Sequence, residues 1–228
     1  MHITHFGHSA VLLDYPQADA ARVLIDPGAF SRPDVAELTD LDAIVVTHQH
    51  PDHVDPARFA QLADSNPDAA LLLEPQTAEM LSAHDQTASL SERLDVLRPG
   101  DPVAVGPLTV SAAGGAHAII HPDIPAVGNL AVIIEADGEK TFAHTGDSLV
   151  PHPELLGIDV IAYPAVAPWS KMQDTIDFLR ITKPGIALPV HDAVASAEGR
   201  AIYLKQATDL APEGTEVRDW PESHELSV

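Results

Sequence analysis

The feature that most constrains this chain is a short apolar segment that ends in a dense group of ionisable side chains. Residues 43–47 read Ala-Ile-Val-Val-Thr, which has the apolar, β-branched composition of a buried strand. Three imidazoles and a carboxylate follow directly, in the order His48-Gln49-His50-Pro51-Asp52-His53. Pro51 prevents regular helix from starting before Asp52, so a turn can aim the first two histidines to one side and Asp52 with His53 to the other.

This combination of side chains indicates a metal site at the end of a strand, where ligands are rigidly placed. Imidazole nitrogen together with carboxylate oxygen suits zinc, and also manganese or iron. The chain has no cysteine, which excludes a zinc-thiolate site, a disulfide framework and a cysteine nucleophile. The alternative is a polar loop in a chain with 13 histidines. The density of ligand types makes chance a poor explanation, and we interpret the segment as a metal site.

The rest of the chain alternates between strand-like and helix-like segments. Strands are predicted at residues 2–6, 10–14, 22–26, 43–47, 70–73, 108–113, 129–136, 141–144, 158–163 and 186–190. Helices are predicted at residues 56–63, 75–84, 172–181 and 197–210. An Asp137-Gly138 hairpin turn is expected between two of the strands. No linker or repeat interrupts the 228 residues, so we expect a single domain over residues 1–228, of the α/β or α+β class.

Acidic residues dominate the charge of the chain. Asp and Glu number 34 against 12 Lys and Arg, which gives a net charge of −22 at pH 7. A field of this sign repels phosphate backbones and anionic membranes, so we expect a small-molecule substrate and neither nucleic acid nor membrane as a partner. The N-terminus lacks a basic region followed by an apolar stretch, and no apolar run is long enough to span a bilayer. A cytoplasmic location is therefore expected, while the oligomeric state is left open.

The cluster at residues 48–53 is also the signature of the metallo-β-lactamase superfamily, and the resemblance extends over nearly the whole chain. Phe6-Gly7-His8-Ser9 and Leu24-Ile25-Asp26-Pro27 resemble the first hairpin of that family. Three later segments, each after a predicted strand, resemble its remaining ligand motifs in the expected order: Gly115-Ala116-His117, Thr145-Gly146-Asp147 and Pro189-Val190-His191. The resemblance implies a four-layer αββα sandwich with the site at one edge, between two similar halves.

The resemblance also implies a particular metal centre. Its two ions would be held by His48, His50 and His117 on the first, by Asp52, His53 and His191 on the second, and by Asp147 on both. Zinc is the expected metal, with manganese or iron as alternatives. A hydroxide bridging the two ions would attack the substrate, so no protein nucleophile is needed. Asp52 and Asp147 would bind metal, offset its charge and orient the nucleophile.

Three further residues are candidates for the surroundings of the ions. Asp26 and Asp192 are placed to accept the spare N–H of a ligating imidazole, with ordinary turn chemistry as the alternative for each. His8 lines the site by resemblance, and the alternative is a surface position on an edge strand.

The sequence gives weaker signals for residues that contact substrate than for the metal ligands. His121 lies four residues beyond His117 and is a candidate to protonate a leaving group or to bind substrate. Trp169, Ser170 and Lys171 precede a predicted helix. They could form part of the entrance, or only a helix start with an aromatic anchor.

The expected activity is hydrolysis of a small ester, lactone or phosphate-containing metabolite. The length leaves little room for the added helical domain of glyoxalase-type thioesterases or for the inserts of nucleic-acid-processing members, and His50 stands where diiron electron-transfer members have Glu. By its compactness and its His8 region the chain is more similar to the compact branch that includes sugar-phosphate lactonases. The alternatives are a phosphodiesterase or nuclease, which needs a cationic surface, and a non-enzymatic metal-binding module, against which the complete ligand set argues.

The charge predicts that the protein does not bind double-stranded nucleic acid at physiological salt. A fluorescence-anisotropy titration with a labelled duplex should show no saturable binding. Salt-sensitive binding with a dissociation constant below about 1 μM would contradict this prediction, because that is tighter than ordinary non-specific binding.

Overall fold

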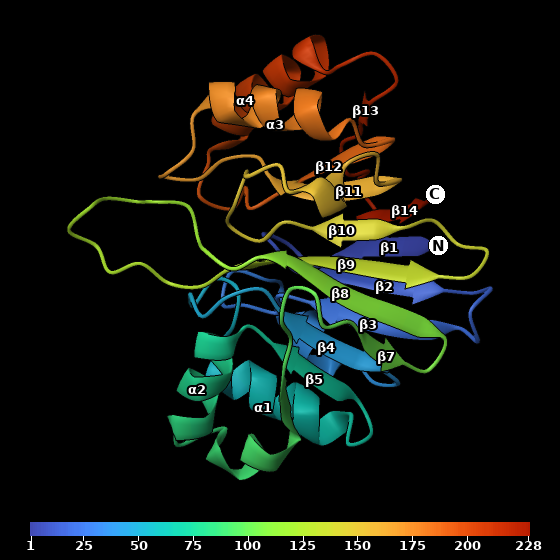
Figure 1. The fold of residues 1–228 in the computed structure, drawn as a ribbon, viewed down its shortest axis with the longest axis vertical. Coiled ribbons are helices and arrows are strands. Elements are labelled where there is room, and N and C mark those ends of the chain that lie inside the picture. The colour runs from blue at the N-terminus through green and yellow to red at the C-terminus, as the bar shows by residue number, and fades with distance from the viewer.

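Two seven-stranded sheets packed face to face form the body of the molecule in a computed structural model that describes residues 1–228 (Figure 1). The strands of the first sheet are, in spatial order, β14 (Glu225–Ser227), β1 (His2–His5), β2 (Val11–Tyr15), β3 (Ala21–Ile25), β4 (Ala43–Val46), β5 (Ala70–Leu73) and β6 (Leu94–Val96). Those of the second sheet are β13 (Glu216–Val217), β12 (Ile186–Val190), β11 (Val160–Pro164), β10 (Phe142–His144), β9 (Leu130–Ala136), β8 (Leu108–Gly114) and β7 (Val103–Val105).

The two sheets have matching topology. The first is antiparallel from β14 to β3 and parallel from β3 to β6. The second is antiparallel from β7 to β10 and parallel from β10 to β13. The expected similarity of the two halves is therefore visible in the strand order, although no sequence repeat marks it.

Helices cover the outer face of each sheet. The helices are α1 (Pro56–Ser65) and α2 (Pro75–Ala83) on the first sheet, and α3 (Met172–Thr182) and α4 (Ala197–Leu210) on the second (Figure 1). Short 3-10 helices span Pro33–Glu37, Ala88–Arg93 and Pro153–Leu155. None of the helices has the length and apolar composition needed to cross a bilayer. The predicted αββα sandwich is confirmed.

The composition of β4 follows from its position between two apolar layers. Ala43 and Val45 face the core between the sheets, whereas Ile44 and Val46 pack toward α1. Since both faces are buried, the strand is apolar throughout instead of alternating with polar residues. The same reasoning explains the Ala-Leu-Leu-Leu sequence of β5.

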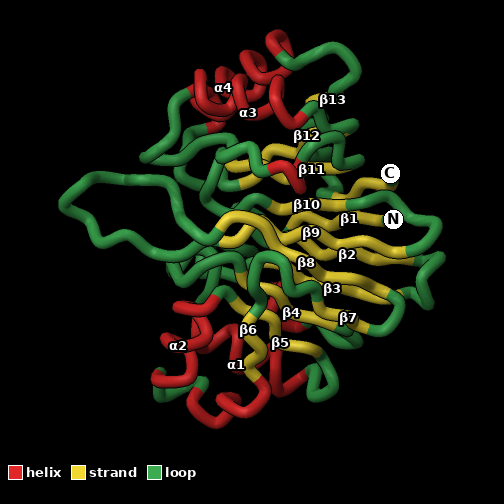
Figure 2. The backbone as a smooth tube through the Cα atoms, in the orientation of Figure 1, coloured by secondary structure: helices red, strands yellow, loops and turns green.

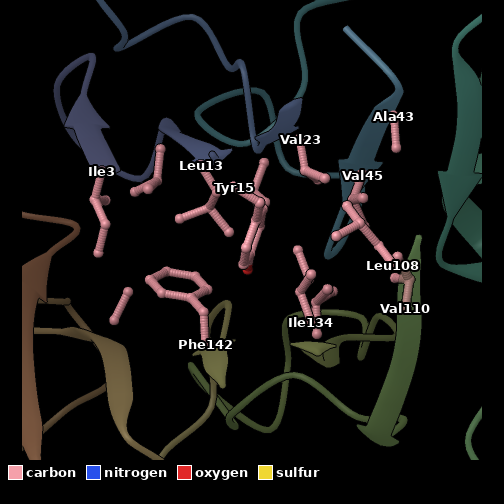
Figure 3. Close-up of a cluster of buried hydrophobic side chains, with 14 of the residues drawn as sticks. Ile3, Leu13, Tyr15, Val23, Ala43, Val45, Leu108, Val110, Ile134 and Phe142 are labelled. Atoms are coloured by element: carbon pink, nitrogen blue, oxygen red, sulfur yellow. The ribbon is translucent and has the colours of Figure 1, made fainter. Parts of the chain in front are cut away.

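The central core lies between the sheets and draws side chains from both. Figure 3 shows Ile3, Leu13 and Val45 of the first sheet pointing toward Ile134 and Phe142 of the second. These side chains are almost completely buried, so they fix how the two sheets face each other.

Most predicted elements are present, and the differences have simple causes. Asp137 and Gly138 do form a turn, closed by the N–H of Glu139 donating to Ala136 O at 3.2 Å. The β9–β10 pairing begins only at Ile134 and Phe142, so the connection is longer than the predicted two-residue hairpin. The four strands that were not predicted are β6, β7, β13 and β14, each of only two or three residues.

Replacing Phe142 by Ala should lower the free energy of unfolding by about 3–5 kcal/mol, because it leaves a cavity where both sheets meet. Denaturant titration measures the change. Ile202→Ala on α4 is the control, since Ile202 is 58% exposed and its loss should cost about 0.5 kcal/mol or less. Equal effects of the two substitutions would contradict this description of the core.

Candidate metal centre

The predicted ligands all follow the carboxyl ends of strands at one edge of the sandwich. Residues 48–53 follow β4, while His117, Asp147 and His191 lie beyond β8, β10 and β12. These three strands run in the same direction, since β8 and β10 are both antiparallel to β9 and β10 to β12 are parallel. The long loop 115–129 leaves the same edge and extends to the left in Figures 1 and 2. Carboxyl ends of strands are where α/β folds place their sites.

The first group of ligand atoms combines both sheets. Its members are His48, His50, His117 and Asp147, and their ligand atoms all lie within 4.8 Å of one another. His48 Nε2 lies 3.1 Å from His50 Nδ1. Two nitrogens at about 2.0–2.1 Å from one tetrahedral zinc ion lie roughly 3.3 Å apart, so the observed spacing suits a shared cation.

The second group contains the three predicted ligands and one residue more. It consists of His8, Asp52, His53 and His191, again within 4.8 Å. Asp52 Oδ2 lies 3.4 Å from His191 Nε2 and 4.0 Å from His53 Nε2. These three side chains thus converge on one point, as the family resemblance implied.

Asp147 contacts imidazoles of both groups. Its Oδ1 lies 3.2 Å from His53 Nε2. Its Oδ2 lies 3.2 Å from His117 Nε2 and 3.2 Å from His191 Nε2. The carboxylate is buried, so it has no alternative solvent partner. This is the position that a ligand shared between two cations must occupy.

Backbone carbonyls fix the tautomers of two predicted ligands. His117 Nδ1 donates to Ala118 O at 2.6 Å, and His191 Nδ1 donates to Val166 O at 2.8 Å. A carbonyl oxygen can only accept, so each Nδ1 carries the proton. In the neutral ring Nε2 then presents its lone pair to the group, which is what metal coordination requires.

Asp26 does the same for the histidines that follow β4. Its Oδ2 accepts from His53 Nδ1 at 2.7 Å and from Thr47 Oγ1 at 2.7 Å, and its Oδ1 accepts from Thr47 N at 2.8 Å. Since the Thr47 hydroxyl proton is used on Asp26, Thr47 Oγ1 accepts from His48 Nδ1 at 3.1 Å. Asp26 is fully buried and orients ligating imidazoles directly and through Thr47, as predicted.

Two buried atoms at the centre, His53 Nε2 and Asp147 Oδ1, lie 3.2 Å from each other and have no other hydrogen-bond partner. Buried polar atoms rarely remain unsatisfied, and an imidazole lone pair beside a carboxylate oxygen suits a cation. Together with the oriented tautomers, this donor set fits two divalent ions.

In the absence of metal, protons supply the positive charge of the site. Burial alone would lower the pKa of His53, but Asp147 and Asp26 outweigh it and raise this pKa to about 10. Burial likewise opposes protonation of His191, whose pKa is raised to about 9 by hydrogen bonds to Asp147 and Asp52. Although burial acts in the opposite sense, the neighbouring histidines hold the pKa values of both Asp52 and Asp147 below their usual range.

His8 reaches the second group with the opposite tautomer. Its Nδ1 accepts from Ala193 N at 3.3 Å, so its Nε2 carries the proton and donates to Asp52 Oδ2 at 3.0 Å. His8 therefore holds a ligand carboxylate in place and is not arranged as a ligand itself. Its left-handed backbone, with φ of 53°, lets His8 O accept from His191 N at 2.8 Å.

Trp169 is the one residue of the predicted entrance segment that reaches the metal centre. Its indole N–H donates to Asp147 Oδ2 at 3.1 Å, and its ring meets the His117 ring edge-on at 5.9 Å between centroids. Ser170 instead bonds to Ala167, and Lys171 starts α3 with its backbone N–H on Asp174. The tryptophan thus restrains the carboxylate that links the two groups.

Sequence reasoning missed the residues that shape the turn before Asp147. His144 Nε2 donates to Ser9 O at 3.0 Å, and its Nδ1 accepts from Gly146 N at 3.1 Å. Asn129 Oδ1 accepts from Asp147 N at 2.8 Å. Gly146 has φ of 56°, and a Cβ there would lie 2.2 Å from Asn129 Oδ1, so only glycine fits. The Thr145-Gly146-Asp147 motif is the sequence signal that points to this turn.

The remaining candidates lie farther out. Asp192 forms an ion pair with Arg200 at 2.5 Å, so the predicted bond to a ligating imidazole is not observed. His121 is exposed on the 115–129 loop and lines a cavity together with His50 and His117. Its catalytic role stays a prediction.

Comparison with known proteins agrees with this geometry. Residues 2–191 match the beta-lactamase superfamily domain, and the chain belongs to the metallo-β-lactamase superfamily. Protein Rv0786c of Mycobacterium tuberculosis is 39% identical over 211 residues, which cover 92% of each chain. The UPF0173 metal-dependent hydrolase of Archaeoglobus fulgidus is 28% identical over 213 residues, covering 84% of this chain and 83% of the relative. The predicted class of enzyme, a metal-dependent hydrolase, is confirmed by such relatives.

A solved structure shows the same fold. Igni18, a metallo hydrolase from Ignicoccus hospitalis, superposes with a TM-score of 0.69 at 18% identity, covering 100% of this chain and 98% of that one. The narrower placement beside sugar-phosphate lactonases is not shown by these relatives.

Loading the protein with metal near pH 7 should release two protons, one each from His53 and His191. Both are charged there because their pKa values, about 10 and about 9, lie above that pH, and coordination requires the neutral ring. Metal affinity should therefore rise with pH until these groups have lost their protons. Calorimetric titration in buffers of different ionisation enthalpy counts the protons, and metal binding without proton release would contradict the assignment.

Proposed function

We propose that the protein uses two divalent ions to hydrolyse a small ester, lactone or phosphate-containing metabolite. The contact of Asp147 with imidazoles of both groups carries this proposal, because one carboxylate so placed can be shared by two cations. The second candidate is a phosphodiesterase or nuclease. A partial likeness to ribonuclease J of Sinorhizobium meliloti favours it, at 34% identity over 133 residues that cover 21% of that protein. The net charge of −22 opposes it.

The chemistry divides between the ions and the chain. When bound, two divalent ions activate a water molecule as the nucleophile and polarise the substrate. Asp147 contributes negative charge to both ligand groups, and Asp52 contributes negative charge to the second. His8 and Trp169 each donate an N–H to one of these carboxylates and thereby limit how it can rotate. His121, which lines the cavity beside the centre, is the group we propose for protonating the leaving atom.

Zinc is the metal we propose. Imidazoles with fixed tautomers and carboxylate oxygens suit a zinc ion, and manganese and iron accept the same ligand types. Elemental analysis of protein reconstituted with each metal in turn, followed by activity assays at equal loading, tests this choice. Full activity with manganese or iron alone would overturn it.

An activity screen distinguishes the substrate classes. Metal-loaded protein would be assayed against lactones, aryl esters, an aryl phosphodiester and a β-lactam. Hydrolysis of a lactone or ester supports the proposal, while hydrolysis of the phosphodiester alone favours the second candidate. No hydrolysis by protein that holds two ions would support a non-enzymatic metal-binding module.

Asp147→Asn should reduce turnover by roughly three orders of magnitude or more, because nucleophile activation and charge stabilisation are lost together. The amide keeps the size of the side chain but removes the charge that both groups contact, so metal content should fall from two ions toward one. Asp209→Asn is the matched control, since Asp209 is an exposed residue of α4. An Asp147→Asn protein that retains two ions and normal turnover would refute the shared role of this carboxylate.

A further inference from the structure

Exposed apolar side chains gather beside the metal centre. Nine large hydrophobic side chains are exposed in the whole chain, and four of them line two adjoining cavities next to the ligands. These four are Ile119, Ile124, Val150 and Ile181, with exposed fractions of 79%, 47%, 53% and 52%. Exposing such side chains together in water is unfavourable, and such surfaces commonly mark a binding site.

The first cavity leads away from the first ligand group. It has a volume of about 400 Å³ and is bounded by His50 and His117 on one side and by residues 118–127 of the long loop on the other. The loop contributes three isoleucines to this wall, among them Ile119 and Ile124. The cavity thus has an apolar wall and opens directly onto two predicted metal ligands.

The second cavity continues the apolar surface on the side of Asp147. It has a volume of about 450 Å³ and lies between residues 148–151, the α3 residues Phe178 and Ile181, and Trp169. Trp169 joins it to the metal centre, because its indole N–H donates to Asp147. Ala118 and Ile119 line both cavities, so the two form one apolar surface around the outer side of the centre.

The charges on this surface disfavour anionic groups. Neither cavity is lined by a Lys or an Arg. The ionised residues that do line them are acidic: Asp123 in the first, and Asp174 and Asp177 in the second. A phosphate or carboxylate on the part of the substrate away from the ions would find no cation and would be repelled.

We propose that the substrate is an uncharged ester or lactone with an aliphatic or aryl portion, and that this portion lies in the apolar surface formed by the two cavities. This proposal rests on the proposed function and narrows it, because it removes phosphate-containing metabolites from the substrate class. Ile119 is the specificity-determining residue, since it is the larger of the two side chains that line both cavities.

Uncharged amides of different length test the apolar surface without requiring turnover. Binding of propanamide and hexanamide to metal-loaded protein would be measured by isothermal titration calorimetry. Each buried methylene should tighten binding about fourfold, so the three additional methylenes should give up to about sixtyfold. The six-carbon half-amide that ends in a carboxylate should bind at least roughly tenfold more weakly than hexanamide, because its charge enters an apolar, acidic surface.

Ile119→Ser tests the location of the site. The variant should weaken hexanamide binding roughly fivefold to tenfold and leave propanamide binding and metal content unchanged. Ile202→Ser on α4 is the matched control, an exposed isoleucine outside both cavities, and should change neither amide. Ile119 is exposed, so its replacement leaves the fold intact, which circular dichroism would verify.

Three results would overturn the proposal: binding that does not depend on chain length, a half-amide that binds as well as hexanamide, or a dimer that dissociates on Ile119→Ser. The last would show that a second copy of the chain covers this surface. Failure of the proposed function can be told apart from failure of this proposal. If amide binding depends on chain length but no substrate is hydrolysed, the proposed hydrolysis is refuted and the apolar binding site is retained.

If charged substrates are hydrolysed and amide binding does not depend on chain length, the apolar binding site is refuted and the proposed hydrolysis is retained.

Discussion

One buried negative charge organises the functional edge of this molecule. Asp147 lies almost out of contact with water, where an unpaired carboxylate costs several kcal/mol. Imidazoles of His53, His117 and His191 surround it, and Trp169 donates a further N–H. The turn around Gly146, the carbonyls that hold the imidazoles and the contact between the two sheets all serve to keep these groups together.

The fold could be predicted where burial acts locally on the sequence. Strands such as 43–46 and 70–73 are apolar throughout because a helix layer covers one face and the second sheet covers the other. The strands β6, β13 and β14 could not be predicted, because two or three residues are too few to show a hydrophobic periodicity. These strands form because a strand distant in the sequence has backbone N–H and C=O groups available for pairing, as where His2 of β1 pairs with Ser227 of β14.

The metal ligands could be predicted because each belongs to a short motif after a recognisable strand. Their partners could not, because those contacts depend on the tertiary structure. The residues next to Trp169 in the sequence do not indicate that its indole N–H donates to Asp147, which lies 22 residues away. His8 shows the limit most clearly: its position beside the site followed from resemblance, but the direction of its hydrogen bond is set by Ala193, 185 residues later.

Each group of ligands draws on both sheets. His48 and His50 meet Asp147 in the first group, and Asp52 and His53 meet His191 in the second. An ion in either position would cross-link two halves of the chain that are otherwise joined mainly by apolar contact. In a chain without cysteine, such ions would cross-link distant segments as disulfides do in secreted proteins, but a chelator could remove them. Resistance of the protein to proteases would then follow the supply of metal.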